Sequence, residues 1–170
     1  MIRSVGVAFL SCGIFAGGFA LAAVEQKRVR TLRNLLLLIS MIESQLRFLC
    51  PPVEDLLCSL RSCASLREFS FLTACLSALR DGAPFASAWA ASIRKEPALR
   101  GLPETAALIT ALGATLGAVD VQGQLDHCAQ CASQLERQLQ TAERRFERSA
   151  RLFPPLGLLL GAFFALLLFR

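Results

Sequence analysis

The sequence of 170 residues contains no tyrosine, one tryptophan and one histidine. No stretch interleaves basic with aromatic side chains, which is the pattern of surfaces that bind and stack nucleic acid. No run alternates apolar and polar residues with period two over the length of a strand. We therefore expect an all-α fold class and no nucleic acid among the partners.

Recognisable catalytic motifs are also missing. The chain has no nucleophile elbow, no phosphate-binding glycine loop, no H-E-x-x-H pair and no closely spaced carboxylates in an apolar setting. The acidic residues mostly stand beside arginine in polar segments. We therefore expect a protein that is not an enzyme and that uses no cofactor.

Two long segments carry no charged residue. The first, residues 5–24, has twenty residues, and the second, residues 152–169, has eighteen. At about 1.5 Å per residue, helices of these lengths would be about 30 and 27 Å long, which matches the hydrocarbon core of a bilayer. All thirteen acidic residues lie between the two segments. We expect transmembrane helices at 5–24 and 152–169 and an aqueous domain at 25–151.

A secretory signal peptide is the alternative for the first segment, because Ala20-Leu21-Ala22 resembles a cleavage site. Against this, the apolar run is longer than that of a usual signal peptide. Basic residues flank the inner side of both segments: Lys27, Arg28, Arg30 and Arg33, and Arg144, Arg145, Arg148 and Arg151. Because basic flanks stay on the cytoplasmic side, we expect the middle domain to be cytoplasmic. The flanks supply most of the net charge of +5, which indicates contact with anionic membrane lipid.

Apolar residues between the two segments recur at three- and four-residue steps, which predicts a bundle of about six helices. We expect them at about residues 32–49, 52–64, 65–80, 83–95, 103–117 and 120–151. Leu49 belongs to the expected apolar face of the first helix, and Trp89 is expected to plug the core. The last helix carries a regular apolar seam, typical of a coiled coil or a bundle: Leu125, Cys128, Ala132, Leu135, Leu139, Ala142 and Phe146.

The segment HCAQC, residues 127–131, is the stretch that suggests metal or thiol chemistry. Cys128 falls on the seam, whereas His127 and Cys131, four residues apart, share a neighbouring face. A structural zinc site needs four ligands, and no second pair has ligand spacing. A redox C-x-x-C motif normally opens a helix within a fold that contains strands. We expect the thiols to pack as small apolar groups and no metal to bind. The alternative is a thiol or metal membrane protein centred on His127, Cys128 and Cys131.

Several segments together resemble those of a known family. They are RTLRNLLLLISMIESQL at 30–46, CPPVEDLL at 50–57, Ala88-Trp89 and LGATLGAVDVQGQ at 112–124. On these segments the chain resembles the stage III sporulation protein AB family of endospore-forming bacteria, over essentially its whole length. The most specific part is the motif L-G-x-x-L-G-x-x-D-x-x-x-Q, formed by Leu112, Gly113, Leu116, Gly117, Asp120 and Gln124.

The resemblance implies a membrane subunit of a channel complex between mother cell and forespore, placed in the mother-cell membrane that engulfs the forespore. Its helical domain would be similar to the cytoplasmic domain of the inner-membrane platform protein of type II secretion systems. The implied partners are the sporulation ATPase of the same complex and the other channel subunits. No catalytic residues are implied. The residues expected to dock a partner are polar and lie off the seam of the last helix: Arg137, Gln138, Arg144, Arg145 and Arg148.

Two interpretations stay open for the motif residues. Gly113 and Gly117, four residues apart, would let helices approach closely, or Gly117 would cap the end of its helix. Asp120 would cap the last helix and Gln124 would hydrogen-bond to the preceding loop, or both would contact a partner. A homo-oligomer is a further hypothesis, because Gly157 and Gly161 match the G-x-x-x-G pattern of membrane helix dimers.

Overall fold

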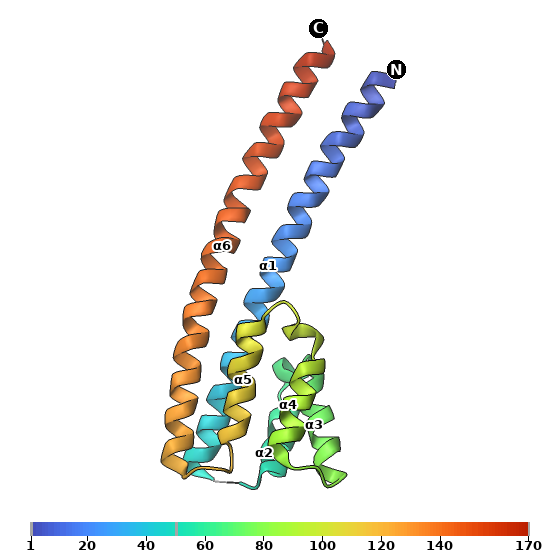
Figure 1. The fold of residues 1–170 in the computed structure, drawn as a ribbon. Coiled ribbons are helices and arrows are strands. Elements are labelled where there is room, and N and C mark those ends of the chain that lie inside the picture. The colour runs from blue at the N-terminus through green and yellow to red at the C-terminus, as the bar shows by residue number, and fades with distance from the viewer. Residues whose placement is uncertain (1, 50, 170) are drawn as a thin grey trace. The chain divides into compact units, whose positions relative to one another are not determined.

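The computed structural model describes the backbone of residues 2–49 and 51–169 and the side chains of residues 23–49 and 51–148. Every regular element in the described backbone is a helix, which confirms the expected all-α fold class. Figure 1 shows the order of the helices along the chain. The α-helices are α1 (Ile2–Phe48), α2 (Val53–Ser62), α3 (Ser70–Arg80), α4 (Phe85–Lys95), α5 (Pro103–Thr115) and α6 (Val121–Phe169), and the short 3₁₀ helices are η1 (Ala64–Leu66) and η2 (Pro97–Leu99).

The chain divides into two compact units. The core unit, Thr31–Gln138, holds the second part of α1, the helices α2 to α5 and the first part of α6. The terminal unit consists of Met1–Arg30 and Leu139–Arg170. Within the core unit, α2 packs against α3, α3 against α4 and α4 against α5, and consecutive helices run in opposite directions (Figure 1).

Membrane-spanning helices were expected at both ends of the chain. Within residues 23–49 and 51–148, no helix is apolar over a length that would cross a bilayer. The expected spans, 5–24 and 152–169, lie outside these residues except for Ala23 and Val24. Both spans therefore stay predictions.

The core unit is built against one face of α1. Apolar residues at three- and four-residue steps place one side of this helix in the interior, where each buried leucine or isoleucine contributes about 1.5–3 kcal/mol. Leu49, which was expected on this face, is 73% exposed. The expectation was wrong: Leu49 is the first residue after α1, and although its amide still donates to the carbonyl oxygen of Gln45 at 2.9 Å, its side chain lies beyond the packed part of the helix. The buried residues of α1 and α2 in this core are Leu32, Leu35, Leu38, Ile39, Ile42, Leu46, Leu56, Leu57 and Leu60.

The third helix begins later than expected, at Ser70 instead of Ser65. The expected first turn forms η1 instead, and the backbone is extended at Phe69 before α3 starts. A carboxylate from a distant part of the chain explains this start: Oε2 of Glu96 accepts the backbone amide of Phe71 at 2.9 Å and the hydroxyl of Ser70 at 2.9 Å. Because the first amides of a helix have no partner inside the helix, an outside acceptor helps to fix where the helix begins.

Two side-chain hydrogen bonds connect α1 to the segments that follow it. Nε2 of Gln45 donates to the hydroxyl of Ser59 in α2. Nδ2 of Asn34 donates to Oε1 of Glu68, between η1 and α3, at 2.5 Å. These bonds add direction to contacts that are otherwise apolar, and they help to set the register of α2 along α1.

Candidate functional site

Trp89 of α4 lies against Gly113 of α5. The indole is 1% exposed, and its Nε1 donates a hydrogen bond to the carbonyl oxygen of Ile109 at 2.8 Å. A β-carbon on Gly113 would overlap Cδ1, Nε1 and Cγ of the indole. Phe71 packs edge-on against the ring with centroids 5.2 Å apart, and Phe85 lies at 5.5 Å. The expected role of Trp89 as a core plug is confirmed.

The second motif glycine ends α5. The last residue of α5 is Thr115, and Gly117 has φ +79°, a left-handed conformation that other residues rarely adopt. The amide of Ala118 donates to the carbonyl oxygen of Thr115 at 3.1 Å, which closes the turn. The expected cap at Gly117 is confirmed. Close approach applies to Gly113, where the approaching group is an indole ring on α4.

Asp120 and Gln124 surround the start of α6. The helix begins at Val121, so that Asp120 directly precedes it. Nε2 of Gln124 donates to the carbonyl oxygen of Val119 at 2.7 Å, which confirms the expected bond to the preceding loop. Oδ1 of Asp120 lies 2.8 Å from the position that a β-carbon on Gly123 would take. A larger residue at this glycine would therefore displace the carboxylate, whose capping of α6 stays a prediction.

The six motif residues lie together along α5, the turn and the first part of α6. Leu112 and Leu116 are 2% and 5% exposed and belong to the core. Gln124 is 8% exposed, which leaves little of its side chain for a partner, whereas Asp120 is exposed. The motif therefore builds the α5–α6 connection. Partner contact through Asp120 and Gln124 stays a hypothesis.

The HCAQC segment, residues 127–131, lies in α6 and contains both buried and exposed residues. Cys128 is fully buried and Cys131 is 6% exposed, whereas His127 is exposed. Sγ of Cys131 lies 3.6 Å from the carbonyl oxygen of Leu108, so that this thiol faces α5. Burial raises the pKa of the Cys128 thiol to about 11, with a contribution from the nearby Glu43 carboxylate, and burial also raises the pKa of Cys131. The expected packing of both thiols as small apolar groups is confirmed.

A raised pKa disfavours the thiolate, which is the form that reacts and binds metals. Cys75 of α3 is similar: it is buried, and burial raises its pKa to about 11. Cys58 is exposed and Cys63 is half-buried. In the part of the chain with described side chains, no three residues of the types His, Cys, Asp and Glu are grouped to hold a metal ion.

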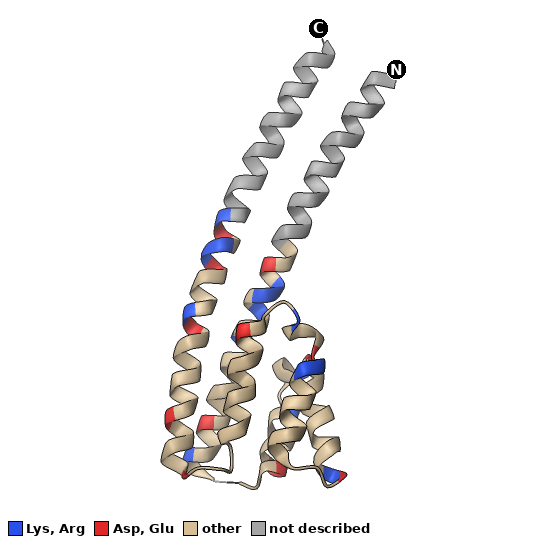
Figure 2. Cartoon of the chain, viewed as in Figure 1, with Lys and Arg blue, Asp and Glu red and all other residues tan. Residues whose placement is uncertain are grey.

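The polar residues expected to dock a partner fall in both units. Arg137 and Gln138 belong to the core unit, whereas Arg144, Arg145 and Arg148 belong to the terminal unit. The four arginines are exposed, and the blue segments of α6 in Figure 2 show where basic residues lie on this helix. Gln138 is half-buried, and its Oε1 accepts a hydrogen bond from the hydroxyl of buried Thr105 at 2.6 Å. Gln138 therefore connects α5 to α6, and docking by the arginines stays a prediction.

Comparison with known families identifies the family of the chain. The model of the family described as stage III sporulation protein AB matches residues 3–169. The chain belongs to this family. Membership indicates a role in sporulation. No curated protein and no solved structure matches the chain.

Sequence patterns did not point to Glu96, which is only 3% exposed. Besides its bonds to Ser70 and Phe71, its Oε1 accepts the amide of Ala98 at 3.2 Å. A buried carboxylate is costly unless donors surround it, and here three donors do so. Glutamate before Pro97 is a recognisable helix start, and it marks η2. No local signal, however, reveals the contact with α3.

Sequence patterns also missed a set of exposed apolar residues at the end of α1 and the start of α6, which we name the apolar end. It consists of Phe48, Leu49, Val119 and Val121, which are 78%, 73%, 42% and 40% exposed. Phe48 is the last residue of α1 and Leu49 follows it, and Val119 and Val121 stand at the start of α6 (Figure 1). Large apolar side chains clustered in water commonly mark interaction surfaces.

Proposed function

We propose that the chain is a non-enzymatic platform subunit of a sporulation channel between mother cell and forespore. Residues 5–24 and 152–169 anchor it in the mother-cell membrane, and the core unit is the cytoplasmic body that docks the ATPase of the complex and other channel subunits. The observation that carries the proposal is the position of two uncharged segments on either side of one folded all-α unit, each with basic residues on its inner side. Family membership supplies the link to sporulation.

Exposed residues beside the uncharged segments support the anchoring. Lys27 and Arg30 are exposed just after the first segment, and Arg145 and Arg148 are exposed just before the second. Each basic residue near an anionic bilayer surface contributes about 1 kcal/mol to binding. Val24, at the boundary of the first segment, is 65% exposed, which suits contact with lipid.

The buried polar groups of the core unit are bonded to other parts of the unit, which supports a role as a scaffold rather than as an enzyme. The buried carboxylate of Glu96 is occupied by three donors, and the buried hydroxyl of Thr105 is bonded to Gln138. The thiols of Cys128 and Cys131 have raised pKa values. These groups hold helices together, and a general acid, base or nucleophile would need to be accessible to substrate.

The location of the core unit is tested by labelling Cys58, which is exposed on α2. Intact cells are treated with a membrane-impermeant maleimide, and the modified peptide is identified by mass spectrometry. We expect Cys58 to react only after the membrane is permeabilised. Cysteine introduced by Arg170→Cys serves as the matched control and should react in intact cells. Labelling of Cys58 in intact cells would show the core unit on the outer side and would end the proposal.

The partner is tested by co-purification. The full-length chain is extracted in detergent with the ATPase of the same complex either produced or omitted. We expect the ATPase to remain bound through affinity purification in amounts comparable to the chain. Repeated failure to co-purify, with the chain folded by circular dichroism, would remove the ATPase from the proposal and leave the membrane anchor.

A further inference from the structure

The apolar end stands out by its exposure. Phe48, the last residue of α1, is 78% exposed, and Leu49, which follows it, is 73% exposed. Val119 and Val121 are about two fifths exposed, at 42% and 40%. Two valines, one leucine and one phenylalanine in water carry several kcal/mol of unused burial energy, since each is worth about 1.5–3 kcal/mol when covered.

The four residues lie at one end of the core unit. Within the core unit, α1 ends and α6 begins at the same end, and their parts in this unit run in opposite directions (Figure 1). Ile42 and Leu46, in the last turns of α1, and Cys128, near the start of α6, belong to the same buried core. A β-carbon on Gly117 would lie 4.0 Å from Cγ2 of Val53, which joins the α5–α6 turn to the start of α2.

Carboxylates border the apolar end. Glu54 and Asp55 occupy the first turn of α2, Asp120 stands between the two valines, and all three are exposed. The helix dipoles do not offset this negative charge. The positive ends of α2 and α6 lie here, but so do the negative ends of α1 and α5, and the two contributions cancel.

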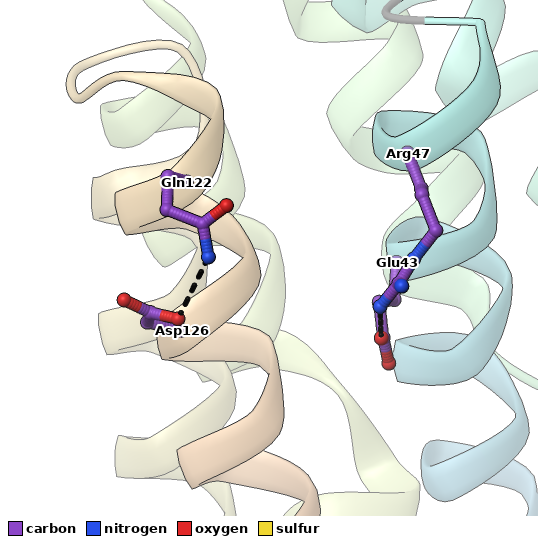
Figure 3. Close-up of polar contacts among 4 residues, drawn as sticks. All are labelled: Glu43, Arg47, Gln122 and Asp126. Carbon is purple, nitrogen blue, oxygen red and sulfur yellow. Dashed lines mark hydrogen bonds and ion pairs between the residues drawn. The ribbon is translucent and has the colours of Figure 1, made fainter.

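Two polar side chains next to the apolar end, those of Arg47 and Gln122, bind residues one turn along their own helices. Arg47 Nη2 lies 2.7 Å from Oε1 of Glu43, one turn back along α1, and Figure 3 shows the arginine side chain directed toward that glutamate. On α6, Nε2 of Gln122 donates to Oδ1 of Asp126 at 3.2 Å, again within the helix (Figure 3). The basic group nearest in sequence is thus paired, and the border of the apolar end keeps its negative charge.

The apolar centre and the acidic border of the apolar end determine which kind of partner can bind there. An anionic bilayer would be repelled by the three carboxylates. A second copy meeting the same surface would bring like charges together, which is unfavourable. A protein surface with apolar side chains bordered by lysine or arginine matches both the apolar centre and the acidic border. We propose that the apolar end of the core unit is the docking surface for such a protein. This inference refines the proposed function and rests on it, because the ATPase of that proposal is the first protein to be tested for binding.

The first test measures binding of the purified ATPase to the full-length chain in detergent micelles. The double variant Phe48→Ser with Leu49→Ser should weaken binding at least tenfold, because it removes the two most exposed anchors. The matched control is Leu37→Ser, a substitution on an outer position of α1 that is 36% exposed and distant from the apolar end, and it should change binding less than twofold. Circular dichroism confirms that the variants fold.

Two contrary results are separable. If the double variant binds normally while Arg144→Gln with Arg145→Gln and Arg148→Gln weakens binding, docking uses the basic flank, and the apolar-end proposal is overturned while the proposed function stands. If the wild-type chain does not bind the ATPase, that part of the proposed function fails.

In that second case, a photoreactive benzoylphenylalanine placed at position 49, and at position 37 as control, decides the question in sporulating cells. An adduct specific to position 49, mapped by mass spectrometry to a partner segment with apolar and basic residues, supports the apolar end. Adducts with lipid or with a second copy, or no adduct beyond the control, overturn it.

Discussion

The terminal unit and the core unit differ most in their charge. The terminal unit contains nine lysines and arginines and three acidic residues, whereas the core unit contains nine basic and ten acidic residues. Their net charges are therefore +6 and −1, which together give the +5 of the chain. The core unit is stabilised by apolar burial and by a few specific hydrogen bonds, which do not depend on net charge. The comparison shows that the basic charge of the chain is concentrated outside the unit that holds the buried apolar core.

The largest effect is expected from Gly113→Ala in the core unit. The new β-carbon would overlap the indole of Trp89, and the ring is held in place by Phe71 and by its bond to Ile109. We expect the free energy of unfolding to fall by at least about 3 kcal/mol, the upper range for overpacked cores. Thermal unfolding of the full chain in micelles, followed by circular dichroism, measures it.

Gly101→Ala is the matched control, because no heavy atom lies within 4 Å of the position that its β-carbon would take. It should change the free energy of unfolding by less than about 0.5 kcal/mol. Equal effects of the two substitutions would mean that Trp89 does not pack against Gly113. Neither variant should alter the labelling of Cys58 from outside the cell, since neither changes the charge of the terminal unit.

The triple variant Arg144→Gln with Arg145→Gln and Arg148→Gln, in the terminal unit, should change the labelling of Cys58 and leave the stability of the core unit unchanged. If residues 152–169 span a membrane as proposed, three basic residues at its anionic surface contribute about 3 kcal/mol together and bias the orientation of that span. We expect a measurable fraction of chains to expose Cys58 to impermeant maleimide in intact cells. The thermal midpoint of the core unit should stay within about 1 °C of the wild type. A large loss of core stability without a change in labelling would contradict the division of roles between the units.

Sequence periodicity was sufficient to predict those parts of the fold that depend on residues close together in the sequence. The apolar seam through Cys128 and Leu135, the turn at Gly117 and the core position of Trp89 each follow from neighbours within one or two helical turns. The start of α3 and the burial of Glu96 depend on a contact between residues 25 apart, Phe71 and Glu96. No local pattern contains that information.

The apolar end escaped prediction for a different reason. Leu49 continues the apolar spacing of α1, and spacing alone assigns it to the core, whereas Phe48 falls off that spacing. The helix ends at Phe48, however, and Phe48 and Leu49 stay 78% and 73% exposed. An exposed binding surface made of core-like residues can be distinguished from a core only once the ends of the helices are known in space.

Glu96→Gln tests the contact that sequence patterns missed. The substitution keeps the size of the side chain but removes the charge that strengthens its hydrogen bonds and turns one acceptor into a donor facing Ser70, Phe71 or Ala98. We expect a loss of about 2 kcal/mol in the free energy of unfolding. Fluorescence of Trp89, the one tryptophan of the chain, reports the transition. Glu104→Gln, at an exposed position in the first turn of α5, is the control and should cost well under about 1 kcal/mol.

The smallest effect expected is a dependence of core stability on alkaline pH. Burial raises the pKa of Cys128 from 9.0 to about 11, so that the folded chain holds this proton more tightly than the unfolded chain. The stabilisation is complete below pH 9 and is lost as the pH rises toward 11, and at pH 10 the loss from this thiol is about 1.4 kcal/mol. Cys75 and Cys131 titrate in the same direction, so the wild type is compared with Cys128→Ala. The variant is less stable at every pH because of the small cavity, but its stability should fall less steeply between pH 8 and pH 10. Parallel pH profiles for the two proteins would mean that this thiol is not desolvated in the folded core.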